Sequence, residues 1–415
     1  MMLGLVALGG ASSAYGRADG PDVGTKLGAD LRAAASAPSM RPDLLELFPE
    51  PIRLQSIDLL TKNGQFALRV RSADGDEGVC LVHRKRIRET YSLMLSRVIP
   101  YFVGKDARFI ERHVDGVFRH GFNYKYQGMA LWGGVGWTEL AILDLLGRRT
   151  GVPLGELFGP RIREHSGLYY AQDSREISVN ETVDELSAMV ASGAKALKLR
   201  LGARVASTEK SRERDRLLIP RARDVVGGDV ELYVDANGSY EFDEAIRVGR
   251  MLEAHDYNWY EEPVRFDDLW ASKRIADELD IPVAAGDQEH SMVRFRWQIE
   301  NEAADLFQPD LLFFGGLIRS MKVAKMAEAA GREVVPHLSG YGLGSLYVLH
   351  FASVVPNAFR YQEWKGDKDG VPYIVDGTDG PLTPVDGRVR VPAGAGLGVT
   401  FDPDFLRGMT KVRAI

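Results

Sequence analysis

The spacing of apolar and polar residues divides the chain into a mixed first part and a second part with a regular repeat. Between residues 52 and 83, runs with strand-like alternation are separated by Asn63-Gly64 and Asp74-Gly75, dipeptides that are typical of tight turns. Between residues 86 and 150, apolar residues recur at helical spacing. These patterns predict strands over 52–60, 65–72 and 78–83, and helices over 86–98, 107–119 and 134–150. The first part is therefore expected to be an α+β unit.

After Pro160 each short apolar run is followed by a longer amphipathic stretch. Six successive runs, from 231–235 to 359–363, each end in or lead directly to an acidic residue or a histidine, at steps of 23 to 27 residues. These six residues are Asp235, Glu261, Asp287, Asp310, His337 and Glu363. A barrel of eight strand-plus-helix units takes ~250 residues, so this step is close to the length of one unit. The sequence therefore predicts an α/β barrel with six polar groups around one mouth.

Two earlier runs, 167–171 and 196–201, supply the first two predicted barrel strands. In the second of them, strand alternation places Lys198 and Arg200 on one face and three leucines on the other. Because the leucines must face the surrounding helices, the two cations are expected to point into the barrel. There they pair with the acidic ring or act on an anionic substrate, and a purely structural ion pair is the alternative.

Three of the six polar groups suggest a metal. Asp235, Glu261 and Asp287 follow consecutive strands, and three carboxylates so placed form a cage for a hard divalent cation such as Mg²⁺. A single acidic residue at a strand end is more often a helix cap or a solvated loop residue. The regular step of all six argues against that interpretation for the set, so we predict a Mg²⁺ site.

Composition narrows the classes of function. The 415 residues are 45% hydrophobic, which suffices for large buried cores. Acidic residues exceed basic ones, for a net charge of −6, and Lys and Arg look scattered along the chain, so we expect no nucleic-acid partner. The single cysteine, Cys80, excludes an intramolecular disulfide and a cysteine zinc site.

The first 49 residues are expected to lie outside the folded domains. An apolar run over 3–10 and the small residues Ala11-Ser-Ser-Ala14 resemble the end of a signal peptide, although no basic residue precedes them. A truncated signal would mean export to the periplasm, and otherwise the run is an apolar tail of a cytoplasmic protein. The run is too short to span a membrane, which takes ~20 apolar residues. Residues 17–49 are predicted to be a flexible lead-in.

The strand-end motifs form an ordered set with further motifs in both parts of the chain. They are Lys198-Leu-Arg200, Asp235-Ala-Asn237, Glu261-Glu262-Pro263, Gly286-Asp287, Gln308-Pro309-Asp310, Gly315-Gly316, Pro336-His337 and Glu363, with Ala141-Ile-Leu-Asp144, the segment 151–159 and Gly396-Leu-Gly398. From about residue 50 to the end, the chain resembles the enolase superfamily, in its mandelate racemase subgroup, alongside muconate lactonizing enzyme-like proteins. No single motif is specific, but the ordered set is a strong signal.

The resemblance implies a (β/α)7β barrel, a modified TIM barrel, with an α+β capping domain built from both chain ends. The expected boundaries are 1–49 for the lead-in, 50–160 for the cap, 161–365 for the barrel and 366–415 for the segment that returns to the cap. Cap loops near Asn63 and over 123–127 are expected to select the substrate. The partner would be a small carboxylic acid, with no membrane span, and a homo-oligomer is expected.

The resemblance also implies residue roles. The Mg²⁺ ligands would be Asp235, Glu261 and Asp287. His337, oriented by Asp310, would remove the α-proton of an acid substrate and leave an enediolate that Glu363 faces. To donate a hydrogen bond to that enediolate Glu363 must be protonated, which burial among other acids could achieve. The predicted substrate contacts are Asn237, Lys198, Arg200 and Glu363, of which the last three also count as catalytic.

Two positions depart from the subgroup's pattern. Asp287 stands where most members carry Glu, and Glu289, two residues on, is a possible substitute. We keep Asp287 as the ligand. Arg200 stands where the commonest pattern has a second lysine that acts as a base, and arginine stays protonated and makes a poor base.

This second departure favours one reaction over another. Racemisation needs a base on each face of the substrate, whereas dehydration can use one histidine to take the α-proton and return a proton to the departing β-hydroxyl. We therefore predict a lyase that dehydrates a sugar acid to a 2-keto-3-deoxy acid. A racemase or epimerase is the first alternative, and a non-catalytic binding protein that keeps the barrel is the second.

Overall fold

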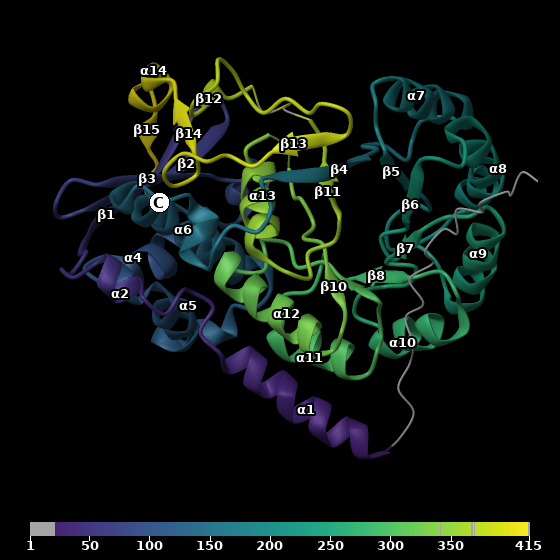
Figure 1. The fold of residues 1–415 in the computed structure, drawn as a ribbon, viewed down its shortest axis with the longest axis horizontal. Helices are drawn as coiled ribbons and strands as arrows, with labels where there is room; N and C mark the ends of the chain where they lie inside the picture. The colour runs from purple at the N-terminus through teal and green to yellow at the C-terminus, as the bar shows by residue number, and fades with distance from the viewer. Residues whose placement is uncertain (1–20, 341, 367, 369, 414–415) are drawn as a thin grey trace, which may run out of the picture.

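The computed structural model describes residues 21–340, 342–366, 368 and 370–413. Figure 1 shows strands and helices of the barrel beside a unit that contains both the first strands and the last one. The sheet of this unit has the order β15, β1, β2, β3, with β1 at Leu54–Lys62, β2 at Gln65–Ser72, β3 at Glu77–Leu81 and β15 at Thr410–Lys411. Since β15 comes from the far end of the chain and pairs with β1, both ends build the cap, as expected.

The helices of the cap follow β3. They are α3 (Arg86–Leu93), a π-helical turn (Met94–Val98), α4 (Ile99–Phe102), α5 (Ile110–Arg119) and α6 (Met129–Thr150), with 3₁₀ turns at Ala107–Phe109, His120–Lys125 and Leu154–Leu157. Among the described residues, α6 is the one helix long and apolar enough to cross a membrane by length and composition. Nearly all of it is buried inside the protein, so it is the core helix of the cap.

Asp144 of α6 joins three parts of the chain. Its carboxylate accepts hydrogen bonds from the backbone N–H of Val79 at 2.9 Å, from that of Leu397 at 2.8 Å, and from Arg148 at 2.9 Å. A side chain at Gly396 would collide with Asp144, because a Cβ atom there would lie 2.4 Å from its Oδ1. The motifs around Asp144 and Gly396 therefore anchor the C-terminal segment to the cap.

The barrel holds eight parallel strands in the order β10, β9, β8, β7, β6, β5, β4, β11. Their bounds are β4 His165–Ala171, β5 Ala196–Arg200, β6 Glu231–Asp235, β7 Trp259–Glu261, β8 Val283–Ala285, β9 Leu306–Phe307, β10 Glu333–Val334 and β11 Tyr361–Trp364. The circle closes where Val334 donates to the carbonyl of Asn357 at 3.0 Å and accepts from the N–H of Phe359 at 2.8 Å. This is the predicted (β/α)7β barrel.

Seven helices separate the barrel strands and cover their outer faces (Figure 1). They are α7 (Val179–Ala191), α8 (Glu209–Val226), α9 (Phe242–Ala254), α10 (Leu269–Glu278), α11 (Met292–Glu300), α12 (Leu317–Ala329) and α13 (Gly344–Val354). The C-terminal segment adds β12 (Tyr373–Val375), β13 (Arg388–Arg390), β14 (Val399–Phe401) and α14 (Pro403–Arg407). The three leucines of β5 and its end pack among the helices, as the alternation predicts.

Aromatic side chains fill the inside of the barrel below the mouth. Tyr169, Tyr233 and Trp259 are buried, and their ring centroids lie 4.3 to 5.5 Å apart. Tyr233 and Trp259 each precede a strand-end acid by two residues, which places them one layer deeper on the same inward face. This packed layer leaves the mouth as the place where polar groups of the strand ends meet.

The prediction of a flexible lead-in is wrong for residues 21–49. The structure has two helices there, α1 (Pro21–Ser36) and α2 (Leu44–Leu47). Leu31 and Phe48 are buried, and the hydroxyl of Ser39 donates to the carbonyl of Ile318 in α12 at 3.1 Å. Leu27 and Leu31 stand one helical turn apart on the face that packs against the core, a pattern obscured by the many small residues. The predicted signal remnant, residues 1–20, lies outside the described residues.

A buried histidine in α13 predicts a dependence of stability on pH. His350 accepts at Nδ1 from the N–H of Gly155 at 3.3 Å, and Nε2 lies 3.1 Å from the carbonyl of Leu397. Burial lowers the pKa of His350 from 6.5 to about 4. The unfolded chain therefore binds the proton first, and stability present above pH 6.5 is lost as the pH falls towards 4.

We expect the free energy of unfolding, from denaturant titrations, to fall between pH 7 and pH 4 by up to about 3 kcal/mol more in wild type than in His350→Gln. Replacing the exposed His120 by Gln is the matched control and should leave the wild-type pH dependence intact. Equal pH dependence of His350→Gln and wild type would contradict the role of this histidine.

Candidate active site

The carboxyl ends of the barrel strands bring together the residues that the sequence singled out. Asp235 ends β6 and Glu261 ends β7, and the two are direct partners in the register of these strands. Asp287 follows β8, His337 follows β10, and Glu363 lies within β11. The four carboxylates among them, those of Asp235, Glu261, Asp287 and Glu363, are almost completely buried, so their charges must be balanced by neighbours.

The two cations of β5 supply that balance. Lys198 is fully buried, and its Nζ lies 2.8 Å from Glu261 Oε2 and 3.0 Å from Glu363 Oε1. Arg200 donates to Asp235 Oδ2 through its guanidinium. Both side chains therefore point into the barrel, as the alternation along β5 predicts.

His337 and Asp310 form a hydrogen-bonded pair. His337 Nδ1 lies 2.7 Å from Asp310 Oδ2, and the other oxygen of Asp310 accepts from the N–H groups of Leu312 and Phe313 at 2.8 and 2.9 Å. An acceptor fixed in this way places the imidazole proton on Nδ1 and leaves Nε2 unprotonated in the neutral ring. Nε2 lies in the ring of polar groups, 3.9 Å from an oxygen of Glu363. The pair has the geometry of a general base and the group that orients it.

The predicted Mg²⁺ ligands offer three buried carboxylates on consecutive strand ends, which is the donor chemistry that Mg²⁺ prefers. As the described side chains stand, no three acidic, histidine or cysteine groups are close enough together to hold an ion. Arg200 and Lys198 instead form ion pairs with Asp235 and Glu261. A divalent cation can replace these cationic partners as the balancing charge, so the residues fit Mg²⁺, and the ligand assignment stays a prediction.

The structure separates Asp287 from Glu289. Glu289 turns away from the mouth: Arg294 donates to its Oε2 at 2.6 Å, and two backbone N–H groups at the start of α11 donate to its Oε1. Asp287 instead lies 3.9 Å from His337 Nε2. Burial opposes its charge, but hydrogen bonding by Glu262 and the positive charges of His337 and Lys198 lower the pKa of Asp287. Of the two carboxylates, only Asp287 faces His337 at the mouth.

This difference gives a matched pair of variants. We expect Asp287→Asn to weaken Mg²⁺ binding by at least about tenfold, because one anionic oxygen donor is lost, and Glu289→Gln to keep wild-type affinity. Both positions are buried and acidic, so the comparison corrects for the general effect of removing a buried charge. Isothermal titration calorimetry with Mg²⁺ measures both, and the reverse order would make Glu289 the ligand.

The expectation that burial protonates Glu363 is wrong. Burial does favour the neutral form, but Lys198, Lys365, His337 and Arg200 together hold the pKa of Glu363 well below its usual range. Lys365 Nζ lies 3.3 Å from Glu363 Oε1, and the N–H of Leu338 donates to Oε2 at 2.8 Å. Glu363 is therefore an anion that holds two ammonium groups, those of Lys198 and Lys365, at the mouth.

Sequence reasoning missed two cations at the mouth. Lys365 is nearly buried, and burial lowers its pKa. Arg175, in the loop after β4, donates to the carbonyl of Leu201 at 2.8 Å and to the side chain of Asn237. Asn237 also donates its N–H to Asp235 at 2.7 Å, so the predicted substrate contact is held in place from two sides. The signal for Lys365 was its position two residues beyond Glu363 on the same strand face.

A cavity of about 640 Å³ lies between the cap and the barrel mouth. From the barrel it is lined by Asp173, Arg200, Arg204, Asn237, Asp287, Gln288, His290, Leu312, Phe313, His337, Ser339, Gly340, Gly344 and Lys365, and from the cap by Gln65, Leu81 to Arg86 and Met129. Of the two cap loops expected to select the substrate, the one near Asn63 does reach the cavity, through Gln65, which follows the same turn. Residues 123–127 do not line it, and the side chain of Asn123 instead bonds the carbonyl of Val117 at 2.8 Å.

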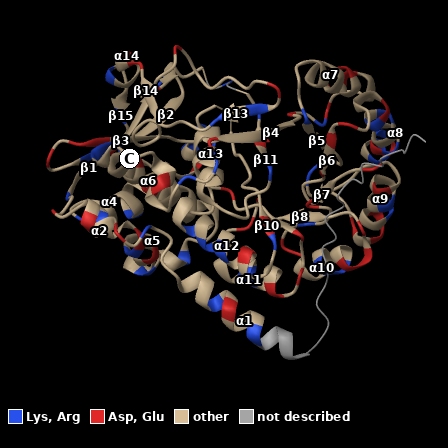
Figure 2. Cartoon of the chain, in the orientation of Figure 1, with Lys and Arg blue, Asp and Glu red and all other residues tan. Residues whose placement is uncertain are grey.

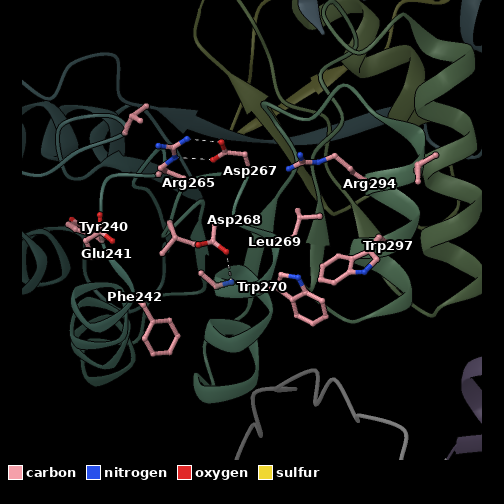
Figure 3. Close-up of a pocket in the computed structure, with 15 residues that line it drawn as sticks. Tyr240, Glu241, Phe242, Arg265, Asp267, Asp268, Leu269, Trp270, Arg294 and Trp297 are labelled. Carbon is pink, nitrogen blue, oxygen red and sulfur yellow. Dashed lines mark hydrogen bonds and ion pairs between the residues drawn. The ribbon is translucent and has the colours of Figure 1, made fainter. Parts of the chain in front are cut away.

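A second cavity, of about 790 Å³, is lined by residues of the loops that follow β5, β6 and β7 (Figure 3). The starts of α9 and α10 and residues of α11 line it, with Trp270 and Trp297 in edge contact. Its Arg265 and Asp267 bond one another at 2.6 Å. None of the predicted catalytic or metal residues lines this cavity, so the cavity under the cap is the candidate active site.

Comparison with known families decides the identity of the barrel. The family described as Enolase C-terminal domain-like matches residues 181–405, which is more than half of the chain. The chain belongs to the enolase superfamily. This confirms the resemblance drawn from the strand-end motifs.

Individual relatives within the superfamily are similar over most of the chain. Arabinonate dehydratase of Saccharolobus solfataricus is 30% identical over 260 residues, which cover 62% of this chain and 67% of the relative. D-galactarolactone cycloisomerase of Agrobacterium fabrum is 29% identical over 314 residues, covering 74% and 81%. A mandelate racemase/muconate lactonizing protein from Paracoccus denitrificans, complexed with magnesium, has a TM-score of 0.78 at 26% identity and covers 88% of this chain and 100% of its own. The protein is thus an enzyme with a barrel and cap, and dehydratases are among its relatives.

Proposed function

We propose that the protein catalyses the Mg²⁺-dependent dehydration of a sugar acid to a 2-keto-3-deoxy acid. The observation that carries this proposal is the pairing of His337 with Asp310 at one side of the cavity, with Arg200 rather than a lysine at the end of β5. One histidine serves dehydration, whereas racemisation needs a base on each side. The similarity to arabinonate dehydratase supports the choice.

The histidine performs the proton transfers. Asp310 holds the proton on Nδ1, so Nε2 accepts the α-proton of an acid bound in the cavity. The imidazolium that results is stabilised by Asp310 and can give the proton to the β-hydroxyl as that group leaves. A syn or single-base elimination therefore needs no second acid or base.

The buried cations stabilise the charge that the proton leaves behind. An enediolate carries negative oxygens, and preorganised cations nearby lower the energy of the transition state that leads to it. Lys198 and Lys365 flank Glu363 at 3.0 and 3.3 Å, so both ammonium groups are already in place. Mg²⁺ held by the three candidate ligands would supply a Lewis acid for the substrate carboxylate.

Epimerisation is the second candidate, and Lys365 is the observation in its favour. Burial lowers the pKa of this lysine, and it lines the same cavity as His337. A lysine with a lowered pKa can act as a second acid or base. The reaction products separate the two candidates, because dehydration forms a keto acid and epimerisation does not.

The test is a screen of sugar acids with the purified protein and Mg²⁺ in D₂O. We expect at least one acid to lose its α-proton signal in the NMR spectrum and to yield a 2-keto acid that forms a semicarbazone. Exchange or stereochemical inversion without a keto acid would make the protein an epimerase. Neither exchange nor product across the whole set would leave a non-catalytic binding protein.

A further inference from the structure

A run of four basic residues forms the part of the cavity wall that the cap contributes. His83, Arg84, Lys85 and Arg86 connect β3 to α3, and all four line the cavity over the barrel mouth. Lys and Arg are interspersed with acidic residues over most of the molecule (Figure 2). This run is the exception to the scattered distribution that the composition suggests, and it lies at the cavity.

The cations of this run are weakly paired. Within the part of the chain that the structure describes, Arg84 and Lys85 lie within 4 Å of no acidic side chain, and both are exposed. Arg86 pairs with Glu89 at 3.2 Å, but the two side chains are 45% and 56% exposed. Ion pairs this exposed contribute little, so all three cations remain available to a ligand.

Arg204 approaches the run from the barrel. It lies in the loop after β5, lines the same cavity, and takes a left-handed backbone conformation with φ of 59°. Burial and the positive charge of Arg200 lower its pKa, the carboxylate of Asp287 raises it, and Arg86 of the cap lowers it again. Arg204 from the barrel and Arg84 to Arg86 from the cap line the same cavity. A non-glycine residue held in this backbone region is strained, and such strain is concentrated at functional sites.

The acidic residues that line the cavity do not balance this charge. Asp173 is bonded to Lys368 at 2.5 Å, and Asp287 belongs to the carboxylates at the floor of the site. The cap wall of the cavity, called here the roof, therefore presents weakly paired cations above the carboxylates of the barrel mouth, its floor. Converging cations of this kind attract and orient anionic ligands, and arginine bonds carboxylate and phosphate through two parallel N–H groups.

We propose that the substrate carries a second anionic group at the end remote from the reacting carboxylate, and that Arg84, Lys85 and Arg204 bind it. The inference rests on the proposed function, in which the reacting carboxylate lies at the acidic floor beside His337. A six-carbon sugar diacid has the required chemistry, with a carboxylate at each end. A sugar acid with a terminal phosphate has it too, and the experiment includes both.

The experiment compares kcat/KM for three matched substrates: a six-carbon sugar diacid, the monoacid of the same stereochemistry, and that monoacid with a 6-phosphate. We expect at least one of the two substrates with a second anionic group to exceed the monoacid by about tenfold or more, with the preference shrinking as salt screens the charges. The substrate that is preferred identifies the second group as carboxylate or phosphate. A preference for the monoacid overturns the inference.

Variants test whether the cations of the roof cause the preference for a substrate with a second anionic group. In the double variant Arg84→Gln/Lys85→Gln the ratio of kcat/KM for the preferred substrate to that for the monoacid should fall by about tenfold. Arg88→Gln, an exposed cation on α3 that does not line the cavity, is the matched control and should keep the wild-type ratio. An unchanged ratio in the double variant also overturns the inference. Failure of the proposed function looks different, because then none of the three substrates yields a 2-keto acid.

Discussion

Replacing Glu261 by Gln is expected to abolish measurable Mg²⁺ binding and to lower kcat/KM by roughly 10³-fold or more, because metal catalysis supplies several kcal/mol of charge stabilisation. Glutamine keeps the shape of the side chain but offers one neutral acceptor in place of two anionic oxygens. It also leaves Lys198, now 2.8 Å from Glu261, with Glu363 as its remaining carboxylate partner. The measurements are calorimetric titration with Mg²⁺ and turnover of a substrate found in the screen.

A carboxylate at the other end of a barrel strand gives the control for this variant. Glu231 begins β6, away from the mouth, and bonds Arg360 and the hydroxyl of Tyr233. Glu231→Gln should keep the wild-type affinity for Mg²⁺. If Glu261→Gln bound Mg²⁺ as tightly as the wild type, Glu261 would be removed from the ligand set and the three-carboxylate site would not stand.

The barrel and the direction of its inward side chains follow from local pattern. The step between Asp235 and Glu261 matches one strand and helix, and the structure makes these two residues direct partners on neighbouring strands. Lys198 and Arg200 point inward because alternation within a strand is set by backbone geometry alone. Such features need no knowledge of distant parts of the chain.

Sequence pattern fails beyond the strand ends. In an extended strand Glu289, two residues on, would share a side with Asp287, but β8 ends at Ala285, and Gly286 takes a φ of 118° that turns the chain. The alternation rule applies to extended backbone, so it no longer holds at residue 289. The same limit hides Arg175 and Arg204, since both lie in loops whose course depends on tertiary contacts.

The charge of Glu363 also depends on tertiary contacts. Burial alone would raise the pKa of Glu363 and favour a protonated acid. Lys198 of β5 and Lys365, just after β11, both contact Glu363, and their positive charges help to lower its pKa instead. No local pattern reports how many cations surround a buried carboxylate. Helix α1 was not predicted for a related reason. Its small residues become buried only by packing on other helices.

Replacing His337 by Asn should abolish α-proton exchange together with turnover, with a loss of ~10²- to 10⁴-fold in rate, as is typical when a general base is removed. Asparagine is close to histidine in length and can still bond Asp310, so the site should keep its shape. If His337 is the only base, no other group takes the proton from the opposite face. The measurement is NMR of the α-proton in D₂O with an identified substrate, for the variant and the wild type.

Three further variants decide what a surviving exchange would mean. His255→Asn, at the end of α9 and away from the cavity, should exchange at the wild-type rate.

Arg200→Lys keeps the positive charge but places an amine where the second base of a racemase would stand. If this variant gained racemase activity, Arg200 would be the residue that excludes racemisation in the wild type. Exchange at the wild-type rate in His337→Asn would contradict single-base dehydration. If that exchange were then lost in His337→Asn/Lys365→Met, Lys365 would be the base, since it is the buried lysine that already lies beside the substrate cavity with a lowered pKa.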